Sequence, residues 1–151
     1  MSPVNPKRVL VAGLAAGLVM NVIDFAANTF VTGGRMQAEL TAVNPQLWSN
    51  LNMPAKMPVF FIIDFVLGIL LVWLYAAMRP RFGPGPRTAI TAALFVWLIS
   101  GTLGYIYVLM GLFSTANFAM NSAVGLINFA ASAWVGGKLY AEPAAPEAPP
   151  A

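Results

Sequence analysis

Two aspartates, Asp24 and Asp64, interrupt long apolar stretches and are the residues best placed to do chemistry. Asp24 lies about seven residues before the end of its stretch and Asp64 about six after the start of the next, so both lie roughly 10 Å deep if the stretches are helices that cross a membrane. A charged aspartate near the bilayer centre costs about 2.5–3.5 kcal/mol, so we expect both to face the interior of a bundle. Two carboxylates a few ångströms apart cannot both ionise in a low dielectric, and at least one should be protonated or metal-bound.

Amide, serine and glycine residues recur at intervals of three and four around these aspartates, a spacing that places them on single helix faces. We expect one half of the bundle to collect a polar cluster of Asp24, Asp64, Asn28, Asn117, Asn121 and Tyr105. Two interpretations remain open. The amides can simply join membrane helices through hydrogen bonds, or the cluster can form a pocket for a cation, a proton or a small ligand.

Glycines on the same faces are expected to serve helix packing, namely Gly13, Gly17 and Gly125. Gly13 and Gly17 fit the small-xxx-small pattern, which is typical both of helix dimers and of close packing within one chain.

Composition indicates an integral membrane protein. Of 151 residues, 59% are hydrophobic and 9% are charged, against about 25% charged in an ordinary soluble domain. Cysteine and histidine are absent, which excludes disulfides, thiol nucleophiles, iron–sulfur clusters and histidine-based acid–base chemistry. We expect no metal site and no cofactor. The net charge of +3 comes from dispersed cations, so nucleic acid is not an expected partner.

Four apolar runs predict an all-α bundle of four transmembrane helices, because each is long enough to cross a hydrocarbon core of about 30 Å. All twelve prolines lie outside these runs. The expected transmembrane domain covers 1–140, with spans at 9–31, 59–78, 89–113 and 116–139, and a disordered Pro/Ala tail covers 141–151.

The distribution of cations predicts the orientation. Six lie on the side of the N-terminus and two, Arg35 and Lys56, on the other. By the positive-inside rule both termini are expected in the cytoplasm, with the chain in a bacterial inner membrane. Arg79, Arg81 and Arg87 surround a tight turn and are expected to contact lipid headgroups.

The loop at 32–58 is the one sizeable segment between spans. Asn44 followed by Pro45 predicts the start of a short helix. Leu47, Trp48 and Leu51 would share one face of it, which suits a helix lying on the outer membrane surface.

The segments 67–88 (LGILLVWLYAAMRPRFGPGPRT) and 8–17 (RVLVAGLAAG) resemble small four-span bacterial membrane proteins of unassigned function. The resemblance covers about half of the chain. It implies a four-span architecture and carries no catalytic or binding residues.

We expect a small, non-catalytic integral membrane subunit that packs against or helps to assemble a larger membrane complex. Its partners would be membrane lipids and other membrane subunits or further copies of itself. The alternative is a small carrier or channel for a proton, cation or small solute built on the aspartate pair. An enzyme acting on a lipid or quinone, with aspartate as acid or base, is a third reading.

Overall fold

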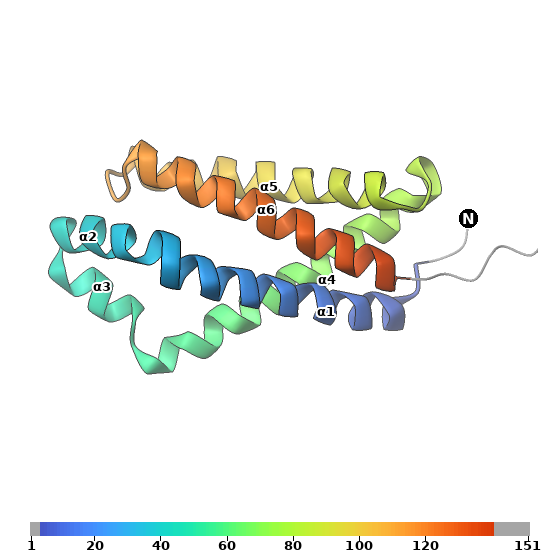
Figure 1. The fold of residues 1–151 in the computed structure, drawn as a ribbon, viewed down its shortest axis with the longest axis horizontal. Helices are drawn as coiled ribbons and strands as arrows, with labels where there is room; N and C mark the ends of the chain where they lie inside the picture. Colours follow the sequence, from blue (N-terminus) through green and yellow to red (C-terminus); the bar gives the residue numbers. More distant parts are fainter. Residues whose placement is uncertain (1–3, 141–151) are drawn as a thin grey trace, which may run out of the picture.

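The computed structural model describes residues 4–140, in which helices are the main secondary structure and no strand occurs (Figure 1). The elements follow in the order α1 (Pro6–Ala27), the π-helical turn η1 (Asn28–Thr32), α2 (Gly33–Val43), α3 (Pro45–Leu51), the 3₁₀ turn η2 (Pro54–Lys56), α4 (Met57–Phe82), α5 (Pro86–Leu109) and α6 (Thr115–Leu139). Four of the resulting helical segments are long and apolar enough to cross a membrane. The prediction of an all-α protein with four such helices is confirmed. The expected tail at 141–151 lies outside the described residues.

Helix boundaries depart from the apolar runs for local reasons. Helix α5 ends at Leu109, before the expected limit at 113, because Gly111 adopts a positive φ of 73°. The amides of Gly111 and Leu112 donate to the carbonyls of Val108 and Tyr107, which closes the helix end. The first helix is longer than expected, since it continues through η1 into α2.

The bundle is tightly packed at one end and open at the other. The start of α1 and the α4–α5 turn lie at one end of the bundle, the N-terminal end (Figure 1). Helices α2 and α3 and the α5–α6 turn lie at the other, the α3 end. Apolar side chains that are fully buried gather toward the N-terminal end, among them Val9, Ala16, Leu71 and Ala92. Large apolar side chains elsewhere stay on the outer surface, as lipid-facing residues do.

Glycines let α1 and α4 cross with their backbones in contact. A Cβ atom on Gly13 would lie 2.5 Å from the Cα of Ile69, and one on Gly17 would lie 2.6 Å from the Cα of Phe65. On α4, a Cβ on Gly68 would lie 2.5 Å from the Gly13 carbonyl oxygen. The small-xxx-small pair of α1 is therefore used within the chain. Because α4 is inclined to α1, the two helices diverge from this crossing toward the α3 end (Figure 1).

Helix α3 begins as its sequence predicts. The Asn44 side chain accepts a hydrogen bond of 2.9 Å from the Gln46 amide, with Pro45 in the first turn. Two residues of its apolar face, Trp48 and Leu51, line a cavity at this end of the bundle. That face covers the opening between α1 and α4.

Candidate functional site

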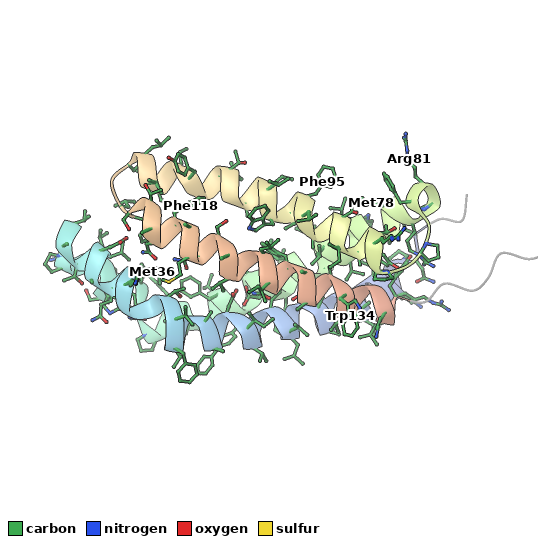
Figure 2. The ribbon with its side chains drawn as sticks, turned by 45° about the horizontal axis from the view of Figure 1, so that its top comes forward. Met36, Met78, Arg81, Phe95, Phe118 and Trp134 are labelled. Atoms are coloured by element: carbon green, nitrogen blue, oxygen red, sulfur yellow. The ribbon has the colours of Figure 1, made fainter. Side chains whose placement is uncertain are left out.

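A cavity of about 370 Å³ lies where α1 and α4 diverge, at the α3 end of the bundle. Residues of α1, α4 and α6 form its walls, and residues of η1, α2 and α3 cover it. Met36 of α2, one of the covering residues, is labelled in Figure 2 between α2 and α6. The volume is within the range of small-molecule sites in proteins.

The cavity collects part of the polar cluster expected from the sequence. Asp24 and Asp64 both line it, and so do Asn28 and Asn121. Asn117 and Tyr105 do not. The Tyr105 ring instead packs edge-on against Phe118, with ring centroids 5.2 Å apart.

Asp24 is held by α6. The Asn128 side-chain amide donates to the Asp24 carboxylate at 2.7 Å and to the Met20 carbonyl at 3.4 Å. The Ser132 hydroxyl donates to the Asn128 carbonyl oxygen at 3.3 Å, which fixes the orientation of the amide. Asn128 and Ser132 are buried. This chain of hydrogen bonds positions one Asp24 oxygen, and the residue also lines the cavity.

Asp64 has no such partner. Within residues 4–140 its carboxylate makes no hydrogen bond and no ion pair. It is half-buried on α4, one turn before the glycine crossing, so its backbone is held close to α1. Nor does any lysine or arginine among the described residues line the cavity. The site therefore contains two carboxylates and no counter-charge of its own.

Amides and aromatic rings complete the walls. Asn21 bridges the two diverging helices, because its side-chain amide donates to the Gly17 carbonyl at 2.9 Å and to the Phe61 carbonyl at 3.3 Å. The aromatic lining residues are Phe25, Trp48, Phe60 and Phe61. Aromatic faces attract cations, so the lining as a whole favours a positively charged, partly apolar ligand.

Gly125 also lines the cavity. A Cβ atom there would meet only Trp97, at 3.9 Å, so close helix packing does not require a glycine at this position. Its small size instead contributes space to the cavity.

Glu39 is a functional candidate that sequence patterns did not single out. Its carboxylate on α2 accepts hydrogen bonds from the Ser114 amide (3.0 Å), the Ser114 hydroxyl (2.5 Å) and the Asn117 side chain (2.8 Å). These donors stand at the N-terminus of α6, where a negative charge is favourable. Asn117 thus links α2 to the start of α6. The Asn121 side-chain amide donates in turn to the Asn117 side-chain oxygen at 2.7 Å. The contact holds α2 over the cavity.

The cavity cannot be assigned to a conventional metal centre. Among the described residues, no three of the types histidine, cysteine, aspartate and glutamate come together. Two carboxylates with amide oxygens nearby can still hold a monovalent or organic cation.

The three arginines expected at lipid headgroups are separated in the structure. Arg79 packs over the rings of Tyr75 and Tyr140, with its guanidinium carbon 5.9 Å and 5.3 Å from their centroids. Arg81 and Arg87 are exposed, and Figure 2 shows Arg81 pointing away from the bundle.

No family model, curated protein or solved structure matches the chain.

Proposed function

We propose that this protein binds a small organic cation in the cavity beside Asp24 and Asp64 and carries it within a membrane. The observation that supports this most is the carboxylate of Asp64, which faces the cavity without a hydrogen bond or ion pair in the described part of the chain. Carboxylates inside a membrane mark ion and substrate pathways.

Charge balance explains why the ligand should be positive. Two neighbouring carboxylates in a poorly solvated cavity repel each other, and a bound cation relieves that repulsion. Since no basic side chain among the described residues lines the cavity, the positive charge that balances an ionised carboxylate there would come from the ligand. The aromatic walls add cation–π attraction and accept an apolar body.

The membrane setting is part of the same proposal. With both termini in the cytoplasm of a bacterial cell, the cavity would open toward the outer half of the inner membrane. The loop that covers it, α2 and α3, would then be the element that admits or retains the ligand.

A matched pair of probes tests the proposal. Benzyltrimethylammonium and its uncharged isostere neopentylbenzene have nearly the same shape, so their difference in affinity reports on charge. We expect calorimetry on the purified protein to detect the cation and not the isostere. Asp64→Asn should weaken binding at least about tenfold, or about 1.4 kcal/mol. Glu147→Gln, which removes a carboxylate outside the described residues, should leave it unchanged. Equal binding of both probes, or an unaffected Asp64→Asn variant, would contradict a cation site.

A second candidate is the accessory subunit expected from the sequence. Helix α5 supports it, because Gly101 has no heavy atom within 4 Å of a Cβ built there and Gly104 meets only Phe118, at 3.7 Å. Small residues on an uncovered helix admit a helix of another subunit. Purification in mild detergent tests this: a stable larger complex that Gly101→Leu disrupts would support a subunit role, and a lone chain that moves the cation into liposomes would contradict it.

A further inference from the structure

A second cavity, of about 230 Å³, lies at the N-terminal end, between the last turns of α4 and α6 and the start of α5. Two cations line it, Arg79 from α4 and Lys138 from α6. No aspartate or glutamate of the described chain does. This charge pattern is the opposite of the one in the Asp24/Asp64 cavity.

Both cations lie over aromatic rings. The Arg79 guanidinium lies over Tyr75 and Tyr140, whose rings meet edge-to-face with centroids 6.2 Å apart. The Lys138 ammonium lies 3.7 Å from the centroid of the Trp134 ring. All five residues line the cavity. Because Tyr75 and Tyr140 are buried, the Arg79 guanidinium has less conformational freedom to lose when an anion binds.

The same cavity offers hydroxyl and backbone groups. The Tyr75 hydroxyl oxygen accepts a hydrogen bond of 3.2 Å from the Gly85 amide. Because a hydroxyl both accepts and donates, this bond leaves the Tyr75 proton for a second partner. Gly85, which has φ of 127°, and Pro86 bring the N-terminus of α5 to the cavity wall. The positive end of this 24-residue helix adds to the charge of the two cations.

We propose that this cavity binds a phosphate group, carried by an anionic membrane lipid or free in solution. A guanidinium and an ammonium are the side chains that recognise phosphate oxygens in proteins, the first through paired hydrogen bonds and the second as a point charge. A lipid phosphate suits the location, since the cavity is formed where helices that fit a membrane end, next to the half-exposed indole of Trp134.

The site differs from general attraction to an anionic surface, and the chain offers its own controls. Arg81 and Arg87 belong to the same turn and carry the same charge, and neither lines the cavity. Diffuse attraction would treat the four cations alike. A built phosphate site depends on Arg79 and Lys138 only. The proposal is independent of the cation cavity at the α3 end.

Native mass spectrometry on the full chain in a neutral detergent tests it. The probes are dioctanoyl phosphatidylglycerol, dioctanoylglycerol, which lacks the phosphate, and inorganic phosphate. We expect one phosphatidylglycerol per chain and no dioctanoylglycerol. Lys138→Gln should weaken phosphatidylglycerol binding about tenfold and Arg79→Gln at least as much, with Arg81→Gln and Arg87→Gln within twofold of the parent.

The probes distinguish a lipid phosphate from free phosphate. Saturation by inorganic phosphate at a similar concentration would support the site and assign it to free phosphate, whereas binding of the phospholipid alone would assign it to a lipid. Equal losses in all four variants, or equal binding of dioctanoylglycerol, would overturn the proposal. Because Arg79 also packs against two buried tyrosines, Arg79→Gln can fail to fold. Lys138→Gln, at an exposed residue, then carries the test.

Discussion

At the scale of single residues, the two aspartates differ in their hydrogen-bond partners. Asp24 receives a hydrogen bond from Asn128, which is itself held by Ser132. Asp64 lines the same cavity without any such partner in the described chain. A ligand cation would therefore meet one carboxylate oriented by a hydrogen bond and one without a hydrogen-bond partner in the described chain. Because only Asp24 has a hydrogen-bond partner, the two aspartates can be tested by different substitutions.

Replacement of both aspartates tests whether they act as a unit. We expect Asp24→Asn and Asp64→Asn each to weaken binding of benzyltrimethylammonium at least about tenfold. The double variant should bind no more weakly than either single one, because residues that share one ligand are not additive. Folding should be kept, since an amide preserves most of the hydrogen bonding. Calorimetry with thermal unfolding of all three variants measures both effects. Full binding by both single variants with unchanged unfolding temperature would mean that the amides and carboxylates only join helices.

Removal of the Asn128 side chain should leave Asp24 without its partner. For Asn128→Ala we expect a loss of about 1–3 kcal/mol in the free energy of unfolding, the range for a buried polar group deprived of its hydrogen bond. Asn52→Ala is the matched control, because Asn52 also lines the cavity while its side chain makes no hydrogen bond within residues 4–140. Equal stability of the two variants would show that the Asn128–Asp24 contact contributes nothing.

At the scale of elements, the cavity exists because α1 and α4 touch at the glycine crossing and then diverge. Close contact at Gly13, Gly17 and Gly68 lets α1 and α4 cross at an inclination (Figure 1), and residues of both helices line the cavity on the α3 side of the crossing. Helices α2 and α3 then cover the opening, held to α6 by the Glu39 hydrogen bonds. The α1–α4 crossing and the covering helices α2 and α3 are separate features, so a substitution can alter either one alone.

The crossing predicts a strong penalty for one added methyl group. Gly68→Ala would place a Cβ atom against the backbone of α1, at 2.5 Å from the Gly13 carbonyl oxygen, so the helices must separate. We expect a loss of about 1–3 kcal/mol, as for an overpacked core. Gly101→Ala makes the same chemical change on α5, where no atom lies within 4 Å, and should be neutral or slightly stabilising. Steric trapping or thermal unfolding in detergent measures the difference, and equal effects would refute the close crossing.

Helices α2 and α3, which cover the cavity, should open more often when the Glu39 side chain is removed. Glu39→Ala breaks three hydrogen bonds at the start of α6, so we expect faster amide hydrogen exchange in α2 and α3 and faster exit of a bound cation. Gln37→Ala, at an exposed position of the same helix, is the control. If exchange in α2 and α3 is the same in both variants, the Glu39 contact does not hold the cover.

Much of this arrangement follows from the sequence, and the rest depends on how the helices are rotated and inclined. Apolar length alone predicts the four membrane-spanning helices, since each must satisfy its backbone within itself. Periodicity places Asn117, Asn121 and Asn128 on one stripe of α6, yet it does not say which amide lies beside Asp24. The crossing angle decides that, and it brings Asn128 to Asp24 and Asn117 to Glu39. A pairing such as Glu39 with Ser114, 75 residues apart, leaves no local signal.

At the scale of the whole molecule, the two cavities have opposite charge and lie at opposite ends. The α3 end contains the aspartates and two cations, Arg35 and Lys56, whereas the N-terminal end contains the other six cations of the chain. Cations gather on the cytoplasmic side of membrane proteins. With that orientation, the phosphate cavity would face the cytoplasmic leaflet, which is rich in anionic lipids, and the cation cavity would face outward.

The predicted orientation of the chain in the membrane decides which side each cavity faces. Because the sequence contains no cysteine, single introduced cysteines can measure this orientation. Single cysteines placed at Ser49, on α3, and at Ser2, near the N-terminus and outside the described residues, report on the two ends. In intact cells a membrane-impermeant thiol reagent should label Ser49→Cys and not Ser2→Cys, and both should react after the membrane is opened. Labelling only at Ser2 would invert the orientation. The aspartate cavity would then open toward the cytoplasm, and the cations at the N-terminal end would meet the outer leaflet, so a carrier of this kind would take up its ligand from inside the cell rather than from outside.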